Sequence, residues 1–108
     1  MDKWLESIYS DGTGDFVSIP EPKLGDRVKI SVRVIKNAPV KGVFMRRIIN
    51  GAEQVLEMKK ERSLGMLDYY CTETTVNEKR ISYSFVFVCE EVLYFLQSGG
   101  YNKIFSRI

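Results

Sequence analysis

The fold is decided by the stretch Gly65–Val88, which reads G-M-L-D-Y-Y-C-T-E-T-T-V, then N-E-K, then R-I-S-Y-S-F-V-F-V. Its second half alternates strictly, and one face carries Ile81, Tyr83, Phe85 and Phe87. Period-two alternation of aromatic and β-branched residues indicates a strand that packs one face into a core. The stretch therefore predicts two β-strands separated by a short polar connection.

The same period appears upstream. Arg27–Lys36 places Val28, Ile30, Val32 and Val34 on one face, which predicts a second clear strand. Val40–Ile49 is also expected to be a strand, but neither of its faces is purely apolar, so its inward side stays open: Val43, Met45 and Arg47 alternate with Phe44, Arg46 and Ile48. Asn50-Gly51 is a strong hairpin signal and predicts that Ala52–Met58 pairs antiparallel with the strand before it.

The remaining segments carry weaker patterns. We expect short strands at Trp4–Ser10, Phe16–Ile19 and Val92–Gln97, and a charged loop at Lys59–Ser63. Short strands with turns at regular intervals and no helical period predict an all-β, antiparallel sandwich or small barrel of about seven to eight strands. We predict one such domain over residues 1–100, with 101–108 as a linker or the start of a following domain.

Composition limits the function. The chain has 108 residues, 44% of them hydrophobic, and a net charge of +2, which fits one globular domain and gives no sign of a nucleic-acid or membrane partner. The N-terminus lacks a basic region followed by an apolar run, which predicts a cytoplasmic location if Met1 is the native start. Histidine is absent, so histidine-based catalysis is excluded. Asp68 and Glu73 fall on opposite faces of one strand and cannot flank a glycosidic bond. We predict no catalysis by this chain.

The two cysteines, Cys71 and Cys89, lie in neighbouring segments. If those segments paired about the N-E-K connection, Cys89 would lie roughly 13 Å along the strand from the residue opposite Cys71. That separation exceeds disulfide reach. We expect two free thiols.

The order of several motifs carries a resemblance. L-D-Y-Y, R-x-x-Y-x-F and a following L-Y-F, preceded by G-D-R-V-K-I-S-V-R-V (Gly25–Val34) and V-F-M-R (Val43–Arg46), resemble the N-terminal immunoglobulin-like module of neopullulanases, cyclomaltodextrinases and maltogenic amylases. That module is classed as a family 34 carbohydrate-binding module on glycoside hydrolases of family 13.

The resemblance implies an immunoglobulin-like sandwich in which Asn77-Glu78-Lys79 passes between the two sheets. It also implies that the module is the N-terminal part of a larger hydrolase of α-glucans such as starch or pullulan. Its expected partners are an α-glucan, the downstream catalytic domain and a second copy in a homodimer of the full-length enzyme.

Sugar binding requires exposed aromatic rings that can stack on pyranose faces. Alternation sends Tyr83, Phe85 and Phe87 to the core. Of the other aromatic residues, those we expect to be exposed, and which are therefore the candidate glucan contacts, are Trp4, Tyr9, Phe16, Phe44 and Tyr101. Starch-binding members of the family use tryptophans, and this chain has one.

In dimeric members of the family, the loop after the third strand approaches the partner's active site. The corresponding candidates for docking or dimer contact are Arg47, Ile48, Ile49 and Asn50. The alternative is a bent hairpin that packs the isoleucines into its own core.

Three further hypotheses remain open. Asp11 and Asp15 flank glycines and are weak candidates for calcium, although a plain turn explains them and we expect no cofactor. A nucleic-acid-binding barrel would use Lys29, Arg33, Arg46 and Arg47 with Phe44 as a basic face. A protein-binding immunoglobulin-like domain without a sugar role is the other alternative.

Overall fold

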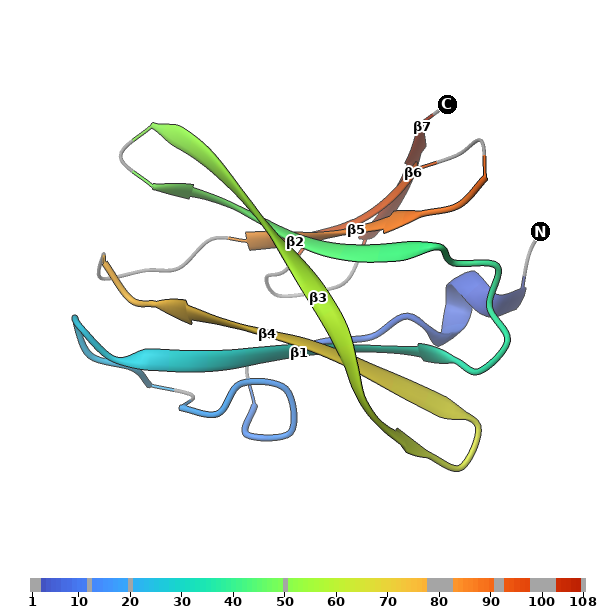
Figure 1. The fold of residues 1–108 in the computed structure, drawn as a ribbon, viewed down its shortest axis with the longest axis horizontal. Helices are drawn as coiled ribbons and strands as arrows, with labels where there is room; N and C mark the ends of the chain where they lie inside the picture. Colours follow the sequence, from blue (N-terminus) through green and yellow to red (C-terminus); the bar gives the residue numbers. More distant parts are fainter. Residues whose placement is uncertain are drawn as a thin grey trace.

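The computed structural model describes residues 3–11, 13–19, 21–49, 51–77, 83–90, 93–97 and 103–107. Within these ranges the chain forms one short 3₁₀ helix and seven β-strands (Figure 1). The elements are η1 (Lys3–Ser7), β1 (Arg27–Ile35), β2 (Gly42–Ile49), β3 (Ala52–Leu64), β4 (Leu67–Thr75), β5 (Tyr83–Val88), β6 (Leu93–Gln97) and β7 (Lys103–Arg107). The all-β prediction is confirmed.

All strand pairs are antiparallel, and the strands pair in the order β1-β4-β3-β2-β5-β6-β7. The long strand β3 belongs to two layers, because its first half pairs with β2 and its second half with β4. Figure 1 shows β3 crossing diagonally from β2 to β4. We call β1, β4 and the second half of β3 the first sheet, and the rest the second sheet. This arrangement is that of an immunoglobulin-like sandwich.

The core lies between these two sheets. Valines and Ile30 of β1 face Val43 and Met45 of β2, Phe85 and Phe87 of β5, and Leu96 of β6, all buried. The inward faces predicted for β1 and β5 are confirmed at the described residues, whereas Ile81 lies outside them. Burial of these apolar side chains is the main stabilising contribution to the fold.

The hairpin predicted at Asn50-Gly51 is confirmed, since Ile49 pairs with Ala52 and Gly51 has a φ of 79°. A left-handed φ of this kind favours glycine. The loop predicted at Lys59–Ser63 is wrong, because β3 continues through it to Leu64. Over this second half, β3 pairs on one side only, with β4, and its side chains are exposed and mostly charged, so it lacks the apolar pattern that a strand normally shows.

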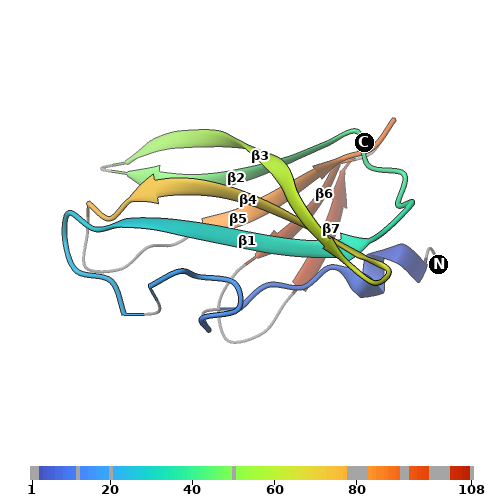
Figure 2. The ribbon, with the colours of Figure 1, turned by 60° about the horizontal axis from the view of Figure 1, so that its bottom comes forward.

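The N-terminal prediction also needs correction. Trp4–Ser10 is not a strand, since Lys3–Ser7 forms η1 and only Tyr9 makes a single bridge, to Arg33 of β1. Likewise, the Phe16–Ile19 segment contributes one bridge, between Val17 and Ile30. Both bridges lie on β1, so the N-terminal segment covers the edge of the first sheet (Figure 2).

The C-terminal part departs from the predicted boundary at residue 100. Lys103–Arg107 forms β7 and pairs with β6 over its whole length, so this segment extends the second sheet. The strand predicted at Val92–Gln97 is confirmed as β6.

β4 and β5 lie in different sheets, as the resemblance implied, and Cys71 and Cys89 are free thiols. Most of the connection between the two strands lies outside the described residues. Among the described residues, no helix is long and apolar enough to span a membrane.

Candidate functional site

The outward side of β2 carries the first candidate surface. Val43, Met45 and Arg47 are buried, so the alternation of the strand turns Phe44, Arg46 and Ile48 outward. This result settles the inward face that the sequence left open. It places one predicted glucan contact, Phe44, and one predicted docking residue, Ile48, on the same outer face of the second sheet.

Neighbouring strands extend this surface. Phe44 pairs with Glu57 of β3 and with Val86 of β5, and Arg46 pairs with Val55 of β3. The apolar residues are well exposed for their type, with Ile48 at 46%, Val55 at 52% and Leu93 at 36%. We call this surface the Phe44 face and define it by Phe44, Arg46, Ile48, Glu53, Val55, Glu57, Val86, Val88 and Leu93.

The Phe44 ring lies close to the backbone of its own strand, at Gly42. A Cβ atom placed on Gly42 would lie 3.1 Å from Cε1 of Phe44, so the ring lies against the Gly42 backbone. The ring is half-buried there. Arg46 pairs with Glu53 at 3.0 Å (Nε to Oε2), whereas Glu57 has no ion-pair partner among the described residues. The result is an aromatic ring with carboxylates beside it on a mostly apolar sheet.

The predicted N-terminal glucan contacts lie elsewhere. Phe16 is buried, so its expected exposure is wrong; its ring stacks on Tyr69 at 6.1 Å between centroids. Tyr9 is 37% exposed, but its ring meets the edge of Phe16 and lies under the guanidinium of Arg33 at 5.0 Å. Trp4 is half-buried, and its ring packs nearly perpendicular to that of Tyr94. Each of these three rings therefore contacts another side chain of the chain, and Tyr101 lies outside the described residues.

The docking prediction is wrong for Arg47. This side chain is 3% exposed and points into the sandwich, where it donates to the hydroxyl of Thr74 and, at 2.9 Å, to the carbonyl oxygen of Thr75. Ile48 is exposed and Ile49 half-buried, while Asn50 lies outside the described residues. The alternative of a bent hairpin that buries both isoleucines is therefore not supported at Ile48.

The predicted turn at Asp11 is built from side-chain hydrogen bonds. One carboxylate oxygen accepts bonds from the amide and hydroxyl of Thr13, at 2.9 and 2.6 Å, and the other accepts the Tyr9 hydroxyl at 2.8 Å. The hydrogen bond from the Thr13 hydroxyl is the main cause that lowers the pKa of Asp11. Among the described residues, no three acidic, cysteine or histidine side chains are grouped as a metal site would require, and Asp15 is exposed.

The basic face expected of a nucleic-acid binder does not form. Lys29 and Arg33 lie on β1 in the first sheet, Arg46 and Phe44 face outward from the second, and Arg47 is buried.

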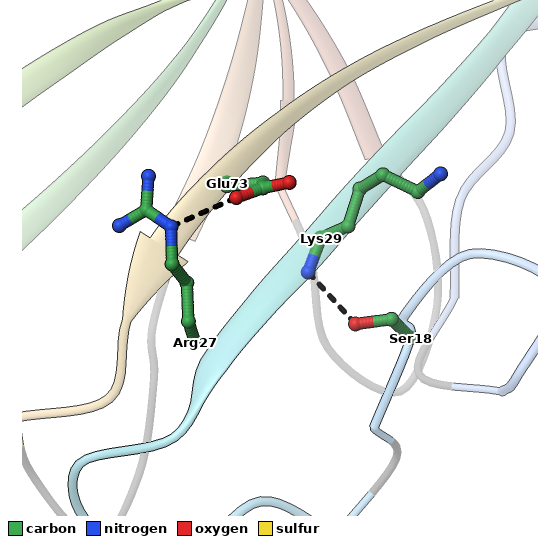
Figure 3. A network of polar contacts seen from close by, with 4 residues as sticks. All are labelled: Ser18, Arg27, Lys29 and Glu73. Atoms are coloured by element: carbon green, nitrogen blue, oxygen red, sulfur yellow. Dashed lines mark hydrogen bonds and ion pairs between the residues drawn. The ribbon is translucent and has the colours of Figure 1, made fainter.

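Figure 3 shows β1 and β4 joined by an ion pair from Nε of Arg27 to Oε2 of Glu73, at 2.8 Å. In the same view the Lys29 amide donates to the Ser18 hydroxyl at 2.8 Å.

Sequence reasoning missed a second surface, at the turn between β3 and β4. Leu64 is 52% exposed and Met66 59%, and Arg62 lies over the Tyr69 ring at 4.6 Å. An irregularity in β3 between Lys60 and Arg62 leaves Glu61 as an extra residue, which receives a bond from Lys29 at 2.7 Å. The signal available in the sequence was Leu-Gly-Met, a glycine turn flanked by apolar residues.

Comparison with known proteins gives a consistent answer. The family described as "Alpha amylase, N-terminal ig-like domain" matches residues 25–107. A solved cyclomaltodextrinase structure superposes with a TM-score of 0.70 at 19% identity, covering 96% of this chain and 19% of the cyclomaltodextrinase. At 19% identity, the likeness to the cyclomaltodextrinase shows that the two share a fold. No curated protein sequence matches the chain.

Proposed function

The chain belongs to the family of N-terminal immunoglobulin-like domains of α-amylases, and from this premise we propose that it is a non-catalytic module that docks on the catalytic domain of an α-glucan hydrolase. The chain spans 19% of the length of the cyclomaltodextrinase that it resembles in fold. Such a module would position the glucan-binding cleft of the parent enzyme, within one subunit or across a dimer.

The Phe44 face is the observation that carries this proposal. Ile48, Val55 and Leu93 expose apolar side chains on one side of the second sheet, around the half-buried Phe44 and Val86. Grouped apolar side chains with a polar rim are typical of protein contact surfaces. The ion pair between Arg46 and Glu53 supplies such a rim, together with the Glu57 carboxylate, which has no ion-pair partner among the described residues.

One observation favours direct glucan contact as a second candidate. The Phe44 ring lies on the Gly42 backbone, where a larger residue would displace it, and Glu57 is its cross-strand neighbour. A ring supported from below by backbone can stack on a sugar, and an adjacent carboxylate can accept hydroxyl hydrogen bonds. In this case Phe44 would contact the substrate rather than another domain.

The docking proposal is tested in the full-length parent enzyme with Val55→Glu and Ile48→Glu. We expect these variants to release the module, seen as faster proteolysis at the domain junction or loss of the dimer by light scattering. Leu24→Glu is the matched control, since Leu24 is 63% exposed and lies in the loop before β1. An enzyme whose assembly and proteolysis are unchanged by both Phe44-face variants would contradict docking through this face.

Electrophoresis of the isolated chain through gels with soluble starch or pullulan separates the two candidates. Docking predicts free migration, because the module contacts protein and not glucan. Glucan contact predicts retardation that Phe44→Ala abolishes and Trp4→Phe leaves intact. Retardation that survives Phe44→Ala would contradict a glucan site at Phe44.

A further inference from the structure

We propose that the β3–β4 turn forms a second interaction surface, which binds an acidic protein surface whose carboxylates surround an apolar recess. We call it the Met66 tip and define it by Ile35, Lys36, Arg62, Leu64, Met66 and Leu67. It lies on the first sheet, and the Phe44 face lies on the second. The inference rests on the proposed function only in taking the chain as part of a larger enzyme.

The apolar centre of the tip is a cross-strand row. Ile35 of β1 pairs with Leu67 of β4, which in turn pairs with Leu64 of β3. Side chains directly opposite each other in antiparallel strands touch, so the three form one continuous apolar band. Ile35 and Leu67 are half-buried, whereas Leu64 is 52% exposed. Met66 follows in the turn and is 59% exposed.

The turn is held in place by backbone contacts. The Lys36 amide donates to the Met66 carbonyl oxygen at 2.7 Å, which ties the turn to the end of β1. Gly65 has a φ of 59°, a left-handed conformation that favours glycine. A surface that is already ordered loses little conformational entropy when a partner binds. Figure 1 shows the turn at the end of the sheet, projecting beyond the other strands.

The charges around the band are mostly positive. Arg62 and Lys36 are exposed and form no ion pair with a described residue. The carboxylate beside them, Glu61, is paired with Lys29 at 2.7 Å, and that hydrogen bond is the main cause that lowers its pKa. Uncompensated cations beside exposed apolar side chains are complementary to an apolar recess with carboxylates at its rim.

The next cross-strand row supports a protein partner over a lipid surface. Tyr69 lies between Arg33 and Arg62 in the register, and the Arg62 guanidinium is fixed over its ring at 4.6 Å. Tyrosine, arginine and methionine are the residues enriched at the centres of protein interfaces. A guanidinium held in one position is suited to pairing with one carboxylate at a fixed place on a protein. Binding to a layer of mobile lipid headgroups does not require the guanidinium to be fixed.

The rate at which Met66 is oxidised reports whether a partner covers the Met66 tip. We expect peroxide oxidation of Met66, followed by mass spectrometry, to be roughly tenfold slower in the full-length enzyme than in the isolated chain, the ratio for a tip covered about 90% of the time. Met58, 4% exposed, and Met45, fully buried, serve as internal references in both samples. High salt should remove most of the protection, because the contact is electrostatic at its rim.

Charge reversal tests the partner's chemistry. Arg62→Glu should abolish the protection of Met66 in the full-length enzyme and leave its oxidation in the isolated chain unchanged. Arg27→Glu is the matched control, because Arg27 lies on the same face at the other end of β1. Equal oxidation of Met66 in enzyme and isolated chain, or protection that Arg62→Glu leaves intact, would overturn the proposal.

Two further outcomes are informative. Protection of Met66 in the isolated chain by phosphatidylglycerol vesicles, without protection in the enzyme, would assign the tip to a lipid surface and overturn the proposal. Met66 protection that survives Val55→Glu and Ile48→Glu would support the tip as a contact independent of the Phe44 face. The failure of one surface is thereby distinguished from the failure of the other.

Discussion

Arg47 crosses the interior of the sandwich from β2 and donates through Nη1 to the Thr74 hydroxyl and the Thr75 carbonyl oxygen of β4. It therefore joins the second sheet to the first by polar bonds. Its Nε has no partner among the described residues. Burying a guanidinium is costly, and the bonds to β4 recover only part of that cost.

We expect Arg47→Ala to lower the free energy of unfolding by about 3 kcal/mol, because it opens a cavity and leaves the Thr75 carbonyl unpaired. Arg47→Met retains most of the volume and removes the buried charge, so its loss should be nearer to about 1 kcal/mol. Urea unfolding followed by circular dichroism measures both. A loss below about 0.5 kcal/mol for the alanine variant would show that Arg47 does not stabilise the sandwich.

At the scale of elements, β3 determines how the two sheets are joined. Its register shifts between Lys60 and Arg62, so Glu61 is an extra residue in the strand. Glu61 reaches Lys29 on the outer side of the first sheet, and Arg62 lies on that same side over Tyr69. Consecutive residues of a regular strand point to opposite faces, so the bulge is what allows both to share one face.

Deleting Glu61 should cost little more than truncating it. The deletion joins Lys60, which pairs with Tyr70, directly to Arg62, which pairs with Tyr69, so the bulge closes into a regular ladder and Arg62 keeps its face. We expect the deletion and Glu61→Ala, each of which removes one exposed ion pair, to lower the free energy of unfolding by less than about 1 kcal/mol. Denaturant unfolding of the two variants side by side is the measurement; a loss above about 2 kcal/mol for the deletion alone would show that the bulge itself stabilises the sandwich.

These elements differ in how well the sequence predicts them. β1 and the Asn50-Gly51 hairpin were predictable because a one-sided apolar pattern and a turn dipeptide are local signals. The second half of β3 was not, since its charged residues alternate with no apolar face and the strand is held by pairing with β4. β7 was missed in the same way, because its place depends on pairing with β6.

The candidate surfaces show the same limit. Each face of β2 carries one arginine, so alternation alone could not choose between Arg46 and Arg47, and only the packing of the two sheets buries Arg47. Phe44 was a predicted contact and lies on an outer face, whereas Phe16 is buried by a contact with Tyr69, distant in sequence. Contacts of that kind leave no periodic signal.

At the scale of the whole molecule, the N-terminal segment joins both sheets. η1 contacts β1, and the Trp4 ring lies nearly perpendicular to the ring of Tyr94 on β6, at 5.2 Å between centroids. Tyr9 and Arg33 exchange backbone hydrogen bonds of 3.1 and 3.0 Å. Ile8, which follows η1 and precedes Tyr9, is buried in the core that the two sheets share. The single tryptophan thus reports on the contact between the segment and both layers.

We therefore expect the chain to unfold as one unit, with Trp4 fluorescence and far-ultraviolet circular dichroism giving the same urea midpoint. Phe85 is fully buried between the sheets, so Phe85→Ala should lower the free energy of unfolding by about 3–5 kcal/mol and shift both signals together. Ile19→Ala, at a residue 36% exposed beside the segment, is the control that should shift neither by much. If Trp4 fluorescence changed at lower urea than the circular dichroism, the N-terminal segment would open separately, and the sandwich would be stable without it.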